Sequence, residues 1–585
     1  MALHSPAGSG GDTLEVSFIR HGHPGSGGRE RSRDRSKVTV TPLGGVGEIG
    51  KNMMVVECGE DMIVIDCGLA FPEDDLPGVD IVLPDMSYVV ERRSRLRAIL
   101  LTHAHEDHIG GVAYLLRDAP APIHGTRLTL GMVEGKLPEH GLRLPPGSRP
   151  FREGEKMTFG ELAVEPFHVT HSVPGAVGFA VHTPAGVLVF TGDFKFDLTP
   201  VDGEVTDLQM LARLGRDGVF ALFCDSTNSE RPGITGSERE VGGTIGRIVA
   251  EAPGRVLVTT FASNVHRIQQ CFDVAAQLGR RVAVVGRSIE NTVQISSRLG
   301  YLHIPEGTLL ESGAIGRTPP EKVIIMTTGS QGEPMSALSR MATGEHRLVD
   351  LVPGDTVILA ASPVPGNEKM VHRTVDNLYR MGARVIYQRD AGVHVSGHAS
   401  REELKLMMTL LRPRWFVPVH GEYRHLVLNA AMAEETGVEH DHVLVGENGT
   451  VFECSGEGMR IAGRIPAGRV LVDGLGVGDV GNVVMRDRRQ LAQDGILVVA
   501  VAVRRETGEV VGSVDVSSRG FVYVRESEPL LAETRSRVQD AIASRMRNGQ
   551  TDWNQIKGVV RETAGQLLFE RTRRRPMILP LVLEV

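Results

Sequence analysis

The sequence predicts a multidomain α/β protein in which stacked sheets flanked by helices are interrupted by a second α/β unit. Three observations lead to this prediction. The chain has 585 residues, too many for one hydrophobic core. Short apolar strands with few helices fill the first part, whereas strands and helices alternate from about residue 218. After about residue 384 the chain again contains histidines in a pattern like that of the first part, so we expect the second unit to be inserted in the first.

The elements follow from the apolar patterns in chain order. The first unit has strands VTVTPL, MMVVE, MIVID and AILLT, then residues 164–169 and 187–191, with helices near 109–116 and 128–137. The inserted unit has strands VFALFCD, RVLVTT, RVAVVG, KVIIMTTG and DTVILAAS between helices at 238–250, 265–278 and 289–299. This alternation predicts a mostly parallel sheet.

A small α+β unit is expected at the end of the chain. Its predicted strands are ILVVAVAV, FVYVRE and MILPLVLEV, with helices at 530–546 and 555–569. We expect this unit to serve self-association, and its arginines between 571 and 575 to form an exposed basic face. The predicted division is a disordered tail 1–36, first unit 37–217, inserted unit 218–384, return and linker 385–480, and terminal unit 481–585.

Composition excludes several classes of protein. Hydrophobic residues make up 41% and charged residues 23% of the chain, as in globular proteins, and the net charge of −8 gives no global attraction to nucleic acid. No apolar run reaches the ~18 residues of a membrane helix, and the N-terminus lacks an apolar signal core. Five scattered cysteines without a CxxC pair indicate buried, reduced thiols of a cytosolic protein with no membrane partner.

The densest chemical motif is THAHEDHIGG at residues 102–111. An apolar strand leads in and a helical pattern leads out. Side chains two apart share a face of an extended segment, so His103 and His105 can bind one cation. Asp107 and His108 follow the turn and can bind a second one. Imidazole and carboxylate ligands suit zinc or a similar metal.

Three more residues complete a two-metal site. His171 in THSVPGA, Asp193 in VFTGDF and His420 in PVHGE all stand at expected strand ends. The predicted sets are His103, His105 and His171 for one cation and Asp107, His108 and His420 for the other, with Asp193 as the bridge. Cations about 3.5–4 Å apart would activate a shared water. Alternatives are a helix cap for Asp193 and a core histidine for His171. Asp66 is expected to orient a ligand histidine.

The glycines of PLGGVGEIG superficially match a dinucleotide-binding fingerprint. That fingerprint needs a helix to begin at the glycines, so that its N-terminal N–H groups meet the pyrophosphate. Residues 51–57 instead have the pattern of a strand. We therefore expect a hairpin whose backbone crowds the floor of the metal site.

The chain resembles the metallo-β-lactamase superfamily and, within it, the β-CASP nucleases, most closely bacterial ribonuclease J. The matching text is PLGGVGEIGKN, THAHEDHIGG, THSVPGA, TGDFKFD, CDSTNSERPG, TTFASNVHRIQQ, TTGSQGEP, HVSGHAS and PVHGE. The resemblance covers about residues 37–450 and implies a metallo-β-lactamase αββα sandwich with an inserted β-CASP α/β domain and a small C-terminal α+β domain. The tail is not covered.

The resemblance also implies roles for residues outside the metal set. Asp225 in CDST matches the first acidic β-CASP motif, and His398 in SGHAS matches the histidine near the scissile phosphate. Asp225 could alternatively cap a turn. A pocket for an RNA 5′ monophosphate is implied, and its candidate donors are Ser263, Asn264, Gly329, Ser330, Gln331, His394, Ser396 and Gly397. For each of these loops a cap or turn is the alternative.

The favoured function is a two-metal ribonuclease acting on single-stranded RNA in decay and maturation. The resemblance implies 5′-to-3′ exonuclease activity that prefers a 5′ monophosphate, endonuclease activity, a homodimer or homotetramer, and other RNA-decay proteins as partners. Zinc is the expected metal, with manganese as the alternative. A DNA-directed β-CASP nuclease, a hydrolase of a small ester or thioester, and a non-catalytic scaffold remain as rival hypotheses.

Overall fold

The computed structural model describes residues 37–585 except 74, 153, 331–335, 364–366, 388–390, 475, 505–508, 523–526 and 548–552. The tail predicted for residues 1–36 and the candidate Gln331 lie outside the described residues. None of the five cysteines forms a disulfide, and all five are buried, as expected. In the described part of the chain, every helix is too short or too polar to span a bilayer.

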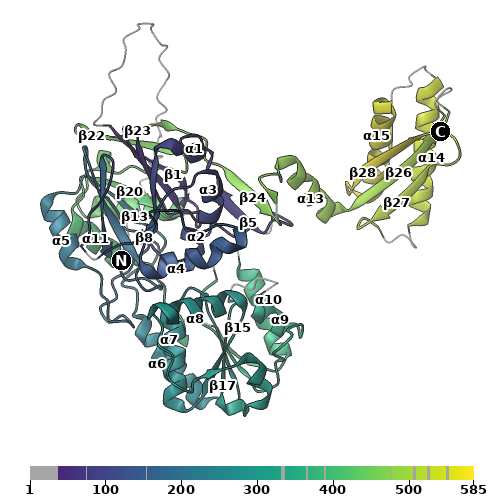
Figure 1. The fold of residues 1–585 in the computed structure, drawn as a ribbon. Helices are drawn as coiled ribbons and strands as arrows, with labels where there is room; N and C mark the ends of the chain where they lie inside the picture. Colours follow the sequence, from purple (N-terminus) through teal and green to yellow (C-terminus); the bar gives the residue numbers. More distant parts are fainter. Residues whose placement is uncertain are drawn as a thin grey trace, which may run out of the picture. The chain divides into compact units, whose positions relative to one another are not determined.

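Two facing sheets form the first unit (Figure 1). The first has the order β23 (Gly458–Arg464), β22 (Thr450–Ser455), β1 (Val38–Gly44), β3 (Met53–Cys58), β4 (Asp61–Ile65), β6 (Leu96–Leu100), β7 (Ile123–Gly125) and β8 (Arg149–Pro150). The second has the order β20 (Trp415–Val419), β13 (Ala221–Asp225), β12 (Gly186–Phe190), β11 (Val177–Thr183), β10 (Leu162–His168) and β9 (Met157–Phe159).

Alternation along the strands explains why these sheets stack. In β3, Met54 and Val56 join the core between the sheets, where they meet Phe179 and Phe223 of the second sheet. Met53 and Val55 belong to a core on the opposite face, which also includes buried residues of the helices. The helices of this unit are α1 (Ser87–Glu91), α2 (Glu106–Ile109), α3 (Val112–Asp118), α4 (Arg127–Lys136), α5 (Leu208–Asp217), α11 (Arg401–Leu411) and α12 (Tyr423–Glu435).

The inserted unit has its own parallel sheet, as predicted. Its order is β16 (Leu309–Leu310), β15 (Arg281–Val285), β17 (Val323–Thr327), β14 (Val256–Thr259), β18 (Thr356–Leu359) and β19 (Arg384–Ile386). Alternate residues of β14 face opposite layers. Val256 and Val258 pack with α6 (Glu238–Glu251), α7 (Val265–Leu278) and α8 (Arg287–Leu299), whereas Leu257 packs with α9 (Ala337–Ala342) and α10 (Glu368–Arg380).

One strand lies in a different sheet from the one that the pattern predicts. Within the predicted strand VFALFCD, residues Ala221–Asp225 form β13, which pairs with β12 and β20 of the first unit rather than with the inserted sheet. A fully buried parallel strand has the same continuous apolar pattern in either sheet, so the sequence does not distinguish them. The predicted residue boundaries of the units otherwise stay predictions.

The terminal unit has one sheet, whose strand order is β27 (Asp515–Arg519), β26 (Ile496–Val503) and β28 (Met577–Glu584). It also has two helices, α14 (Glu528–Arg547) and α15 (Trp553–Thr572) (Figure 1). Two details differ from the prediction. Phe521 and Val522 of FVYVRE lie after the strand rather than in it, and the helix α13 (Asn482–Asp494) precedes β26. Smaller pairings join β25 (Gly476–Val477), β24 (Arg469–Asp473) and β5 (Ile81–Pro84), and β2 (Val46–Gly47) with β21 (Gly421–Glu422).

Candidate metal centre

Carboxyl ends of neighbouring parallel strands bring the polar residues together. In the second sheet, β12, β13 and β20 are parallel neighbours; Asp193 follows β12, Asp225 ends β13 and His420 follows β20. In the first sheet, β4 and β6 are parallel neighbours that lead to Asp66 and to the THAHEDH loop. Both sheets therefore deliver donors to one edge of the sandwich.

The first donor group contains His103, His105, His171 and Asp193, with one donor atom from each lying within 4.8 Å of all the others. The Nδ1 atom of His105 lies 3.1 Å from His103 Nε2 and 3.2 Å from His171 Nε2. Burial lowers the pKa of His103 and His171 well below the usual value and that of His105 to about 4. Three neutral imidazoles aimed at one point suit a divalent cation.

The second donor group contains Asp107, His108, Asp193 and His420, again within 4.8 Å of one another. Asp193 Oδ2 lies 3.3 Å from His108 Nε2, and Asp193 Oδ1 lies 2.6 Å from His420 Nδ1. Burial opposes protonation of His420, but Asp193 outweighs it and raises the pKa of His420 to about 9. Asp193 belongs to both groups, which is the arrangement expected of a bridging ligand.

Neighbouring groups orient several of these histidines. Asp66 Oδ2 lies 2.7 Å from His108 Nδ1, and its carboxylate also accepts hydrogen bonds from the N–H and hydroxyl of Thr102. His171 Nδ1 lies 2.7 Å from the carbonyl oxygen of Gly397. A Cβ at position 397 would lie 2.6 Å from His171 Cε1, so this close approach requires glycine. Such contacts fix ring orientation and tautomer.

Backbone strain is present at two of these positions. Asp66 has φ 60° and His420 has φ 50°, values that side-chain-bearing residues rarely adopt. The N–H of Ser226 and the hydroxyl of Thr227 donate to the carbonyl oxygen of His420 and stabilise its unusual conformation.

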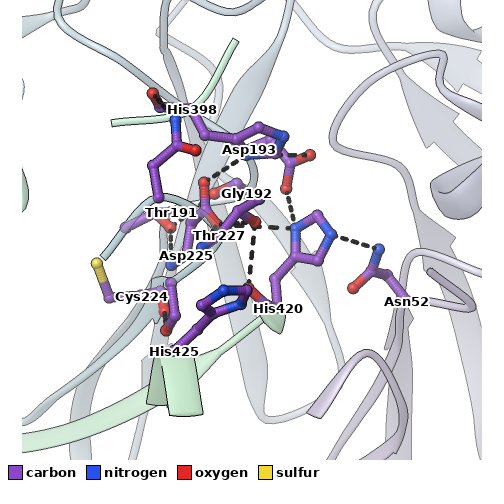
Figure 2. A network of polar contacts seen from close by, with 12 residues as sticks. Asn52, Thr191, Gly192, Asp193, Cys224, Asp225, Thr227, His398, His420 and His425 are labelled. Carbon is purple, nitrogen blue, oxygen red and sulfur yellow. Dashed lines mark hydrogen bonds and ion pairs between the residues drawn. The ribbon is translucent and has the colours of Figure 1, made fainter. Parts of the chain in front are cut away.

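A third group places Asp225 and His398 beside the second donor group (Figure 2). His398 Nδ1 lies 2.8 Å from Asp225 Oδ2. Burial opposes the charge on His398, but Asp225 and then Asp193 outweigh it and raise the pKa of His398. The other oxygen of Asp225 accepts hydrogen bonds from the N–H and hydroxyl of Thr227, so the alternative role as a turn cap is also present.

The phosphate-pocket candidates lie on loops at one edge of the inserted sheet. Ser263 and Asn264 follow β14, and Gly329 and Ser330 follow the adjacent parallel strand β17. Asn264 caps α7, because its side chain accepts a hydrogen bond from the Arg267 N–H at 3.1 Å. Gly329 has φ 108° and Ser330 is buried. Carboxyl ends of parallel strands are where ligands bind in such sheets.

The loop that carries His398 also contacts the inserted unit, because His394 on this loop lies beside the buried side chain of Arg267. Arg267 pairs with Glu238, donates to the carbonyl oxygen of Ala360, and lies 3.2 Å from His394 Nδ1. Ser396 on this loop accepts a hydrogen bond from Asn228 at 2.8 Å. The structure thus links His394 to the inserted unit through Arg267, whereas Ser396 contacts the segment after β13 and Gly397 packs against His171.

Sequence reasoning assigned no role to Asn52, and it treated Arg267 only as a weaker candidate for contact with the nucleic-acid backbone. Asn52 approaches the second donor group from the glycine-rich hairpin, and Arg267 is fully buried. No spacing in the sequence indicates that Asn52 approaches the donor group or that the side chain of Arg267 is buried. The expected hairpin is confirmed, because β1 and β3 pair antiparallel around the glycines and no helix begins there.

Comparison with known families matches four parts of the chain. The metallo-beta-lactamase superfamily matches residues 46–283, and the ribonuclease J beta-CASP domain matches residues 253–378. The RNA specificity domain of Zn-dependent metallo-hydrolases matches residues 382–443, and the ribonuclease J C-terminal domain matches residues 483–585.

Similar proteins extend over nearly the whole chain. Ribonuclease J2 of Bacillus subtilis is 42% identical over 95% of this chain and 100% of its own length. Ribonuclease J of Thermus thermophilus is 42% identical over 94% of this chain and 95% of its own. A solved Enterococcus faecalis protein of unknown function has a TM-score of 0.50 and 17% identity over 71% of this chain and 99% of its own, a likeness of fold alone.

The fold and the donor groups define a metallo-β-lactamase-type hydrolase that uses divalent metal and carries an inserted β-CASP domain. The similar proteins and the matching C-terminal domain identify the family more closely. The chain belongs to the ribonuclease J family, whose members are metal-dependent ribonucleases that bind RNA. The fold class expected from the sequence is confirmed.

Proposed function

We propose that the chain is a two-metal ribonuclease with 5′-to-3′ exonuclease activity that prefers a 5′ monophosphate, together with endonuclease activity. The observation that carries this proposal is the pair of donor groups that share Asp193. Their seven members are the proposed metal ligands: His103, His105, Asp107, His108, His171, Asp193 and His420. When bound, two cations would activate water and stabilise charge on the phosphate.

The remaining residues would position the substrate and move a proton. Because Nδ1 of His398 is bonded to Asp225, Nε2 is the atom left to hold a proton for the leaving 3′ oxygen or to donate to a phosphate oxygen. Asp225 fixes that tautomer and favours the protonated ring. The product of such a cleavage carries the 5′ phosphate.

Zinc is the proposed metal because most of the seven ligands are imidazoles, which suit zinc better than harder cations. Manganese is the alternative, since Asp107 and Asp193 supply oxygen to the second group. Metal analysis of the purified protein, combined with activity in each metal, decides between them.

The preference for a 5′ monophosphate would come from the loops at the edge of the inserted sheet. Ser263, Ser330 and Ser396 offer hydroxyl groups, and Gly329 offers backbone N–H without a side chain. Asn264 and His394 would complete the pocket. A terminal phosphate bound there would place the first phosphodiester near His398.

The test uses 5′-labelled single-stranded RNA carrying a monophosphate, with zinc or manganese added. The matching triphosphate RNA and a DNA of the same sequence are run beside it. We expect release of the labelled mononucleotide, slowed by the triphosphate and abolished in Asp193→Asn. Cleavage of the DNA alone would support a DNA nuclease. Cleavage of neither, with metal bound, would favour a small-molecule hydrolase or a scaffold.

We also propose that the terminal unit, residues 481–585, joins chains into a dimer or tetramer in the cytoplasm. β28 is the edge of its sheet, and Leu579, Leu581 and Leu583 on this strand are 42%, 44% and 59% exposed. An apolar edge strand is suited to pairing with another chain. Leu581→Lys should shift the oligomer toward monomer in light scattering, and an unchanged mass would refute the assignment. Other RNA-decay proteins are further proposed partners.

A further inference from the structure

The side chain of Asn52 reaches the second donor group from the hairpin that precedes β3. Its Nδ2 lies 3.3 Å from Asp107 Oδ2 and 3.0 Å from His108 Nε2. The same atom lies 3.4 Å from His420 Nε2, the contact drawn in Figure 2. It also lies 3.2 Å from the backbone carbonyl oxygen of Asp107. The residue is 8% exposed. One amide nitrogen thus contacts all the proposed ligands of the second cation except Asp193.

The backbone carbonyl and the carboxylate of Asp107 can only accept hydrogen bonds, so the nitrogen end of the Asn52 amide faces the ligands. A Cβ at Gly45, where φ is 84°, would lie 2.1 Å from Asn52 Oδ1, so the amide oxygen occupies space that only glycine leaves open. The N–H of Asn52 donates to the Asp107 carbonyl at 2.9 Å, and its own carbonyl accepts from Gly68 at 2.9 Å. Both backbone groups of Asn52 are therefore anchored next to Asp107.

Asp107 is the proposed ligand that most needs such support. Its side chain is 29% exposed, whereas those of His108, Asp193 and His420 are 3%, 3% and 6% exposed. Among the described residues, Asn52 supplies the hydrogen bond that its carboxylate accepts. A ring nitrogen that ligates a cation has no lone pair left for an N–H donor. With metal bound, the two N–H bonds of Asn52 would therefore be directed to Asp107 alone.

We propose that Asn52 is a positioning residue that sets the affinity of the second cation by holding the Asp107 carboxylate in its ligating orientation. The inference rests on the proposed metal centre. It assigns to the Gly45-to-Asn52 hairpin a part in metal binding, although the hairpin contributes no ligand of its own. Loss of a hydrogen bond to a ligand typically weakens metal affinity about 10–100-fold.

The experiment measures metal binding rather than turnover. Metal-free wild type and Asn52→Leu are dialysed against buffered zinc or manganese, and bound metal per chain is measured by mass spectrometry across free-metal concentrations. Leucine keeps the approximate shape of asparagine but donates no hydrogen bond. We expect wild type to bind two cations, and the variant to keep the first unchanged while the dissociation constant of the second rises about 10–100-fold.

Two further variants separate this role from a structural one. Asn52→Ala removes the same donor and leaves a small void, so it should weaken the second cation to a similar extent whatever happens to the melting temperature. Asn448→Ala is the matched control. Asn448 bonds Val46 and Glu48 of the same hairpin but contacts none of the ligands. It should leave both affinities unchanged.

Each result has a distinct meaning. If wild type binds two cations and Asn52→Leu binds both as tightly, the role of Asn52 is refuted while the metal centre stands. Equal weakening of both cations, or an equal effect of Asn448→Ala, also refutes it, because general loosening of the hairpin would explain the loss. A wild type that never binds two cations refutes the proposed metal centre itself. Recovery of ribonuclease activity in the variant at raised metal would support the assignment.

Discussion

The contact between Asp225 and His398 predicts that the two residues act as one catalytic unit. His398 Nδ1 lies 2.8 Å from Asp225 Oδ2, and the side chain of Asp225 is 1% exposed, so solvent cannot replace the carboxylate. His398→Ala removes the proposed proton donor and should lower kcat by about 10²–10⁴. At ~1.4 kcal/mol per factor of ten, this equals about 3–6 kcal/mol of barrier.

Asp225→Asn tests whether the carboxylate acts through the imidazole. The amide keeps the shape of the side chain but removes the charge that favours a protonated His398, so we expect a loss of about 10–10³ in kcat. The variant that carries both Asp225→Asn and His398→Ala should then be no slower than His398→Ala alone. The effects of substitutions in residues that act as a unit do not add.

The assay is single-turnover cleavage of 5′-monophosphate RNA at saturating enzyme, with bound metal measured for every variant. Metal content is the necessary control, because Asp225 also lies 3.9 Å from the proposed ligand His420. Losses that multiply in the double variant, at unchanged metal content, would refute the reasoning and give Asp225 a separate role. Thr227→Val removes a hydroxyl donor to Asp225 but keeps the carboxylate, so its effect should be much smaller.

Three other predictions concern stability. Arg267→Met leaves the carboxylate of Glu238 buried without its ion-pair partner, so the free energy of unfolding measured with denaturant should fall by about 3–5 kcal/mol. Adding Glu238→Gln should restore part of this loss, and a loss below about 1 kcal/mol would contradict the prediction. Burial opposes ionisation of Asp197, but Lys195 and backbone N–H groups outweigh it and lower the pKa of this carboxyl. The ionised Asp197 should therefore stabilise the folded state above pH ~4, and this contribution should fade at lower pH. The stability gap between wild type and Asp197→Asn should therefore shrink on acidification, and a constant gap would refute it. A chelator should lower the melting temperature, and excess zinc should restore it.

The sequence places the candidate donors at strand ends, and the structure brings these residues together, while their part in metal binding stays a prediction. THAHEDH places four donors in one short loop, and Asp193 and His420 follow buried strands that can end only at one edge of the sheet. The stacked sheets and the inserted α/β unit followed from the apolar patterns, whereas the metallo-β-lactamase and β-CASP fold followed from the family resemblance. The sheet to which FALFCD belongs could not be predicted, because a fully buried parallel strand has no polar face to distinguish its neighbours.

Other features depend on contacts between distant segments. Asn52 lies far along the chain from His420, yet the two side chains meet because β2 pairs with β21. Gly397 stays a candidate for phosphate binding through its N–H, and no spacing in the sequence indicates that its carbonyl and its missing Cβ also serve His171. Helix α13 was missed because it has no apolar stripe, and Val483 and Val484 are exposed.

The placement of the ligands has a consequence for how the sandwich is held together. His103 and His108 come from the end of β6 in one sheet, whereas Asp193 and His420 come from β12 and β20 in the other. All four are nearly inaccessible to water. His103, His105 and His171 are neutral imidazoles packed at short distances, which gain little from one another, and burying polar groups is costly unless they have good partners. Cations bound between them would replace these costs with bonds that cross the two sheets. The edge of the sandwich that carries the chemistry is therefore an edge where bound metal would add stability across the two sheets.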